Sequence, residues 1–241
     1  MAINPSELRH PETTRQTASM FGALLIAAIV CGVLNSVPAL EASDYLETLA
    51  AHESRILVAV FFQAAMAVIY VAIAVIMYPL VRIDSRNSAL AYVTFRSIGA
   101  GFLFVGIVTL LLLLALGRRL AQAGAPAAAD AALIGGLLRQ GRDWLNHIGM
   151  ILPWSIGGLF LYRAFLRTGV IPRWLAIWGL VGTALTLVAT ILYMLDQIQI
   201  VTVAYFALNA PTALLEVTLA VYLIARGFQH SEPALQPSAH N

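Results

Sequence analysis

Six long stretches of the sequence contain no Asp, Glu, Lys or Arg, and they limit the folds that the chain can adopt. The stretches run 16–40, 56–81, 97–117, 144–162, 174–195 and 197–215. A helix needs about 20 mostly apolar residues to cross the hydrocarbon core of a bilayer. Lipid offers the backbone no hydrogen-bond partner, so only helices and closed barrels cross it, and runs without strict alternation indicate helices. The sequence therefore predicts an all-α polytopic membrane protein with a bundle of six transmembrane helices.

The composition agrees with a lipid environment. Apolar residues make up 60% of the chain and charged residues only 11%, whereas soluble domains carry about 25% charged residues. The formal net charge of +2 is too small to indicate nucleic-acid binding. We therefore expect the lipid bilayer as the main partner and no nucleic acid.

The membrane helices are expected to extend slightly beyond the charge-free stretches. The expected spans are 18–38, 56–79, 89–116, 144–166, 173–195 and 200–225. The long connection 117–143 holds Pro126 followed by an Ala-rich run, which predicts a short extra helix in the loop, lying on the membrane surface or capping the bundle. The expected organisation is an N-terminal segment 1–17, a transmembrane domain 18–228 and a tail 229–241.

The distribution of arginine predicts the orientation. All the basic residues are Arg, and cytoplasmic loops carry an excess of basic residues. With both termini inside, the cytoplasmic segments hold eight arginines and the outer segments five. The sequence thus predicts a multi-pass protein of the inner (cytoplasmic) membrane with both termini in the cytoplasm.

The connection between the fourth and fifth spans reads as a tight hairpin. Arg163 and Arg167 lie one turn apart at the end of a helix, where cations interact favourably with the helix dipole. Gly169 suits a left-handed helix cap, and Pro172 suits the first turn of the following helix.

Two ionisable residues lie well inside the predicted spans. Arg96 and Glu216 are expected about 10 and 15 Å from the same membrane face, counted at about 1.5 Å per residue. Such residues are functional candidates by default. Three interpretations stay open: an intramembrane ion pair that locks two helices, an Arg96 side chain that snorkels to the headgroups, or a ligand or proton site. Asn209, beside Pro211, either fills a gap in a packing kink or faces a binding cavity in a broken helix.

A second polar group is expected at the outer end of the fourth span. Asp143 and His147 are spaced i, i+4 on one helix face, with Asn146 between them. The arrangement could relay a proton, but two ligands are too few for a metal, and interfacial anchoring is the simpler interpretation. No Walker loop, dinucleotide fingerprint, GxSxG or HExxH motif occurs, so no cofactor and no metal site is predicted.

Small residues spaced by four permit close contact between helices. The pairs are Ala18/Gly22, Ala28/Gly32 and Ser97/Gly101. We read them as packing signals.

Three segments carry a family resemblance: RQTASMFG at 15–22, YRAFLRTGVIPRWLAIWGLVG at 162–182, and the closing Pro, Glu and Gly of 211–227. They resemble a bacterial family of small multi-span membrane proteins known only as a domain of unknown function, DUF4386. Arg96 is similar to an arginine that the family carries early in its third span. At 99–101 the chain has Gly, Ala and Gly where a bulkier or acidic residue is expected. The resemblance implies a membrane bundle and no assigned activity.

Three functions therefore compete. The favoured one is binding or transport of a small-molecule or lipidic ligand around Arg96, Glu216 and Asn209. The second is a structural or regulatory membrane subunit without catalytic activity. An intramembrane enzyme using Asp143 and His147 is least favoured, because no third catalytic group can be placed.

Overall fold

The computed structural model describes residues 11–42, 44–123 and 128–229, and within these ranges the chain forms helices and no strands. Most of the expected N-terminal segment 1–17, and all but one residue of the expected tail 229–241, lie outside the described residues. The all-α prediction is confirmed for the described part of the chain.

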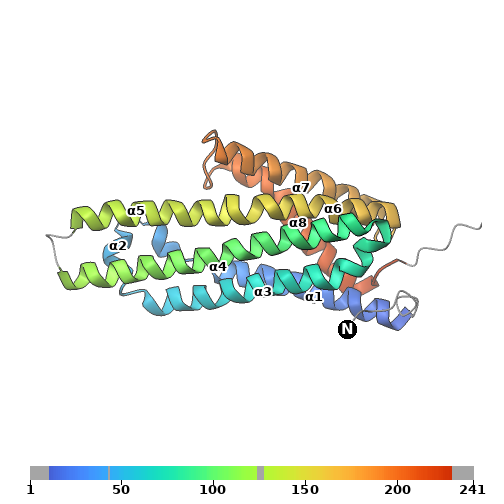
Figure 1. The fold of residues 1–241 in the computed structure, drawn as a ribbon, viewed down its shortest axis with the longest axis horizontal. Helices are drawn as coiled ribbons and strands as arrows, with labels where there is room; N and C mark the ends of the chain where they lie inside the picture. Colours follow the sequence, from blue (N-terminus) through green and yellow to red (C-terminus); the bar gives the residue numbers. More distant parts are fainter. Residues whose placement is uncertain (1–10, 43, 124–127, 230–241) are drawn as a thin grey trace, which may run out of the picture.

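Six helical segments of this part are long and apolar enough to cross a membrane. They are α1 (Pro11–Leu34), α3 (Glu53–Asp84), α4 (Arg86–Ala123), the joined helices α5 (Ala128–Trp144), η4 (Leu145–Met150) and α6 (Ile151–Thr168), then α7 (Arg173–Met194) and α8 (Val203–Arg226). Two short elements, η2 (Pro38–Glu41) and α2 (Tyr45–Thr48), occupy the connection between α1 and α3. The predicted six-helix membrane bundle is therefore confirmed (Figure 1).

The extra helix expected in the long loop exists as α5, but it does not turn onto the membrane surface. Figure 1 shows α5 continuing in line with α6, and the two are joined by the π-helical turn η4. The apolar span Ala129–Thr168 has 40 residues, which at 1.5 Å per residue is about 60 Å, twice the roughly 30 Å of a hydrocarbon core. The joined helix therefore projects well beyond the membrane at the end where α4 meets α5.

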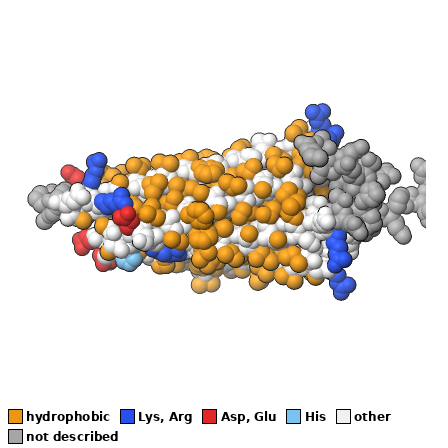
Figure 2. All heavy atoms as spheres, turned by 90° about the horizontal axis from the view of Figure 1, so that it is seen from below, with side chains coloured by type: hydrophobic (Ala, Val, Ile, Leu, Met, Phe, Trp, Pro, Cys, Tyr) orange, Lys and Arg blue, Asp and Glu red, His pale blue; other side chains and the backbone are white. Residues whose placement is uncertain are grey.

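The surface of the bundle matches its surroundings. Figure 2 shows apolar side chains covering the middle of the molecule, with charged side chains gathered at the two ends. Phe61, Val68 and Val75 are each more than half exposed on α3. Exposed apolar area of this extent is stable only against lipid or a partner.

The first and last helices pack against each other. Gly22 of α1 makes this possible, because a Cβ atom added there would lie 2.7 Å from the carbonyl oxygen of Ala220 and 2.8 Å from Cγ1 of Ile224, both on α8. Gly101 of α4 faces open space, with no atom within 4 Å of an added Cβ. Two of the three small-residue pairs therefore differ: Gly22 lies in a helix contact, and Gly101 faces outward.

The predicted hairpin between α6 and α7 is present. Gly169 caps α6 in the left-handed conformation, with φ 66°, and its N–H donates to the carbonyl of Phe165. Pro172 directly precedes α7, which begins at Arg173. Four residues therefore connect the two helices, at the end of the molecule where α1 begins and α8 ends.

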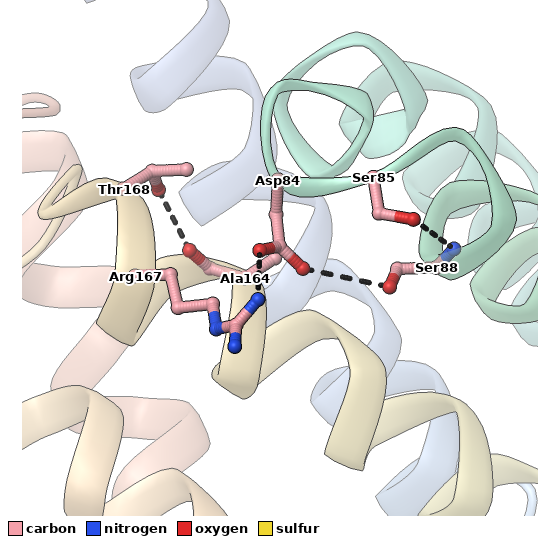
Figure 3. A network of polar contacts seen from close by, with 6 residues as sticks. All are labelled: Asp84, Ser85, Ser88, Ala164, Arg167 and Thr168. Carbon is pink, nitrogen blue, oxygen red and sulfur yellow. Dashed lines mark hydrogen bonds and ion pairs between the residues drawn. The ribbon is translucent and has the colours of Figure 1, made fainter.

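A polar network ties this end together (Figure 3). Asp84, at the end of α3, has a side chain only 4% exposed. Its carboxylate lies 3.3 Å from Nη1 of Arg167 on α6 and accepts a hydrogen bond of 3.5 Å from the hydroxyl of Ser88 on α4. The buried carboxylate of Asp84 on α3 therefore contacts side chains of both α4 and α6.

Candidate functional site

A large cavity of about 1050 Å³ lies at the end of the bundle where α4 meets α5. Figure 1 shows the α7–α8 hairpin ending partway along the joined α5–α6 helix, with its tip standing away from that helix. Residues of α1, η2, α2, α3, α4, α5, η4, α6, α7 and α8 line the cavity. Because so many elements contribute, the cavity is a property of the whole bundle.

One wall of the cavity is the π-helical turn η4. It contributes Asn146 and His147, and π turns inside helices occur frequently at functional sites. Pro153 follows three residues after η4. Proline has no N–H to donate and its ring crowds the carbonyl one turn back, which favours a local departure from α-helical geometry.

The two residues of the predicted outer polar site both line this cavity, but they are not bonded to each other. Nδ1 of His147 lies 2.6 Å from the hydroxyl of Tyr205 on α8, and the His147 ring also stands edge-on to Tyr193. Asp143 has no hydrogen bond or ion pair with any described residue. Among the described residues, no group of three or more His, Cys, Asp or Glu is placed to hold a metal ion.

A second charged pair lies at the same cavity. Arg139 of α5 forms an ion pair of 2.9 Å with Glu41 of η2, and its guanidinium lies 5.4 Å from the ring centre of Tyr45. Burial raises the pKa of the Tyr45 hydroxyl above its ordinary value, and nearby Arg139 lowers it by less. Tyr45 therefore keeps its proton at neutral pH and can donate a hydrogen bond.

Four side chains that line the cavity carry buried polar atoms without a hydrogen-bond partner. They are Tyr45 (hydroxyl), Arg142 (Nε), Asn146 (Oδ1) and Trp154 (Nε1). Buried polar groups are nearly always paired with protein, water or a ligand. A shared cavity lined by several unpaired groups is therefore a candidate binding site.

Beyond the inner end of the cavity lies the guanidinium of Arg96, in a cage of aromatic rings. Arg96 is 5% exposed, and its Cζ lies 4.6 Å from the ring centre of Trp154, 5.6 Å from that of Tyr92 and 5.7 Å from that of Tyr70. Cations are attracted to aromatic faces within about 6 Å. The cage explains how a buried arginine is held away from the headgroups, and the snorkelling interpretation does not describe this geometry.

Arg96 and Glu216 line the same small chamber of about 50 Å³, which we call the inner chamber. None of the ion pairs among the described residues includes either side chain, so direct pairing stays a prediction. The hydroxyl groups of Ser155, Thr183, Thr186 and Thr212 also line the chamber, beside apolar side chains such as Ile151. A space of this size with polar groups in its wall has room for water, which needs about 10–15 Å³ and several partners.

Trp154 belongs to both spaces, because it lines the large cavity and the inner chamber. Asn209 lines neither of them. Its amide donates to the carbonyl of Tyr205 at 2.9 Å within the same helix, and α8 continues across Pro211 without a break. The structure thus brings Arg96 and Glu216 together, and Asp143 and His147 together, and leaves Asn209 apart.

The family description "Domain of unknown function (DUF4386)" matches residues 20–227. The chain belongs to this family. No curated protein and no solved structure matches it. The match includes both the large cavity and the inner chamber, so the site lies wholly within the DUF4386 domain.

Several residues of the DUF4386 site were not singled out from the sequence. The sequence predicts Trp154 as an interfacial or lipid-facing anchor, whereas the structure places it at both spaces inside the bundle. Tyr205 reads as an ordinary aromatic residue of a membrane helix, and Arg142 as an arginine of the outer loop. A signal for Arg142 was present, because it lies one turn before Asn146 on a helix that continues into the span. Thr186 and Thr212 share a hydrogen bond of 2.8 Å between α7 and α8, which no local sequence pattern announces.

Proposed function

We propose that this membrane protein binds a small amphipathic ligand in the large cavity, as a carrier or transporter of that ligand. The observation that carries the proposal is the cavity itself, with its unpaired polar groups. Ligand pockets usually measure about 300–1,000 Å³ and combine apolar walls with a few placed polar groups. At about 1050 Å³ this cavity lies just above the upper end of that range.

The cavity has a polar part and an apolar part. The charged residues all come from η2 and α5, while the deeper lining includes Met66, Tyr70, Leu103 and Met150. An amphipathic molecule would place its polar group among the charges and its apolar part against the deeper side chains. This division supports an amphipathic ligand over a purely polar solute.

The arginine count predicts that both termini lie in the cytoplasm, and in that orientation the large cavity lies toward the outer face. The inner chamber then lies on the cytoplasmic side of Trp154. Movement of Trp154 would connect the two spaces, which is the feature that favours transport over simple storage. The enzyme alternative draws little support, because His147 is bonded to Tyr205 rather than to Asp143.

The test is a thermal-unfolding screen of the purified protein in detergent against lysolipids, amphipathic metabolites and metals. A ligand present at about 100 times its Kd stabilises the folded state by about 2.7 kcal/mol. We expect at least one amphipathic compound to raise the unfolding temperature in a concentration-dependent way.

Two glycines of α5 provide a matched pair of variants. An added Cβ meets no atom within 4 Å at either Gly136 or Gly141, but only Gly136 lines the cavity. Gly136→Leu should fill part of the cavity and weaken the ligand response, while Gly141→Leu should keep it. If no compound stabilises the wild-type protein, or both variants respond alike, the binding proposal fails and the structural-subunit alternative gains.

A further inference from the structure

The charges of the large cavity fall into two groups. Arg139 and Glu41 neutralise each other in an ion pair. Arg142 and Asp143 line the same cavity, but neither takes part in an ion pair or hydrogen bond with a described residue. The cavity therefore offers one free cation and one free anion among its described lining residues.

An unpaired charge in a partly buried place is costly unless something compensates it. Arg142 and Asp143 are both only partly exposed, and Nε of Arg142 is fully buried without a partner. Direct pairing of the two would remove most of the cost, yet they lie more than an ion-pair distance apart. The site is thus arranged to hold two opposite charges separately.

We propose that the ligand of the large cavity is a zwitterion, with a phosphate or carboxylate bound by Arg142 and an amine cation bound by Asp143. This inference rests on the proposed function and specifies its ligand class. Arginine is well suited to phosphate and carboxylate, because its planar guanidinium offers several donors at once.

The neighbouring groups fit both halves of such a ligand. Tyr45 and Trp154 also line the cavity, and each carries a buried polar atom without a hydrogen-bond partner. The rings of Tyr193 and Phe206 also line the cavity, and aromatic faces attract ammonium groups. The formal charges of the cavity residues Glu41, Arg139, Arg142 and Asp143 sum to zero. A neutral zwitterion therefore matches the cavity better than a purely anionic or cationic ligand.

This chemistry occurs in two sources: a zwitterionic lipid headgroup, and a free soluble zwitterion. Four probes separate the possibilities. Lysophosphatidylethanolamine carries both charges and a tail, lysophosphatidylglycerol only the anion and a tail, dodecylamine only the cation and a tail, and glycerophosphoethanolamine the headgroup charges alone. Binding is measured by the shift in unfolding temperature and by tryptophan fluorescence, to which Trp154 contributes together with the three other tryptophans of the chain.

The expected result is that lysophosphatidylethanolamine binds the wild-type protein at least tenfold more tightly than either singly charged amphiphile. Arg142→Gln should weaken binding of lysophosphatidylethanolamine and of lysophosphatidylglycerol by about tenfold or more, and Arg142→Lys should restore part of it. Asp143→Asn should remove only the preference for the zwitterion. Arg118→Gln, which removes one side of an exposed ion pair with Glu53, is the control. It should change neither the affinity for the lysolipids nor the preference for the zwitterion.

Each outcome bears on a definite claim. A response to glycerophosphoethanolamine equal to that of the lysolipid assigns the site to a soluble zwitterion, and a response to the lysolipid alone assigns it to lipid. If the singly charged amphiphiles bind the wild type as tightly as the zwitterion, the zwitterion inference is overturned while the binding function stands. If none of these probes and no compound of the wider screen stabilises the protein, the binding function itself fails. Ligand-free unfolding temperatures show whether each variant is folded.

Discussion

Replacing Gly22 by alanine should loosen the contact between α1 and α8. The new methyl carbon would lie 2.7 Å from the carbonyl oxygen of Ala220 and 2.8 Å from Cγ1 of Ile224. Optimal contacts between heavy atoms are about 3.5–4.0 Å, so the two helices must separate by up to about 1 Å. The oxygen belongs to a helix backbone and cannot rotate away.

The size of the effect follows from two opposing terms. Overpacking costs about 1–3 kcal/mol, and the backbone clash places Gly22→Ala toward the upper part of that range. Alanine returns up to about 1 kcal/mol through its higher helix propensity. The net expected loss is about 1–2 kcal/mol of unfolding free energy.

Gly101→Ala is the matched control, because the same chemical change meets nothing within 4 Å there. Only the propensity term acts, so this variant should gain about 0.5–1 kcal/mol. At about 2–4 °C per kcal/mol for a chain of this size, the two variants should differ by roughly 3–12 °C in unfolding temperature. Thermal unfolding in one detergent measures both. Equal shifts, or a stabilised Gly22→Ala, would refute the assigned α1–α8 contact.

Two further predictions concern the buried charges. Arg96→Gln and Glu216→Gln should each lower the unfolding temperature. The loss of unfolding free energy in the double variant should be about 1–2 kcal/mol smaller than the sum of the two single losses, because the groups interact across the inner chamber. Additive losses would mean that the two groups do not interact. Asp84→Ala should cost about 1–2 kcal/mol because it removes the partners of Arg167 and Ser88 at a buried carboxylate. A loss below about 0.5 kcal/mol, as is typical of exposed pairs, would contradict a structural role for Asp84.

The fold was predictable because the physics of lipid leaves few choices. The six charge-free stretches located every span, and Gly169 with Pro172 located the tight hairpin. The limits of α4 and α5 were not predictable from hydropathy, because a helix does not end where the hydrocarbon ends. No proline lies in 128–143, so the helix continues through this segment, and α5 takes up most of the loop expected there.

The site was predictable only in part, for a related reason. Burial cost singles out Arg96 and Glu216 from sequence, and the structure places both at one chamber. The partners that make the arrangement specific come from other helices: the Trp154 ring beside Arg96, and the Tyr205 hydroxyl beside His147. Which faces of distant helices meet depends on their rotation and tilt, and the pattern within a single helix does not contain that information.

The π turn η4 sets the rotation of everything before it on the same helix. An i→i+5 turn holds one residue more than the α-helical turn it replaces. Removing that residue would restore an unbroken α-helix and swing the preceding segment by about 100°, the angle of one residue in a helix of 3.6 residues per turn. Arg139, Arg142 and Asp143 would then face away from the cavity, although α6 and its contacts stayed in place. The number of residues in this one turn therefore determines which way the charged side chains face, so the number of residues between Trp144 and Ile151 matters as much as their identity.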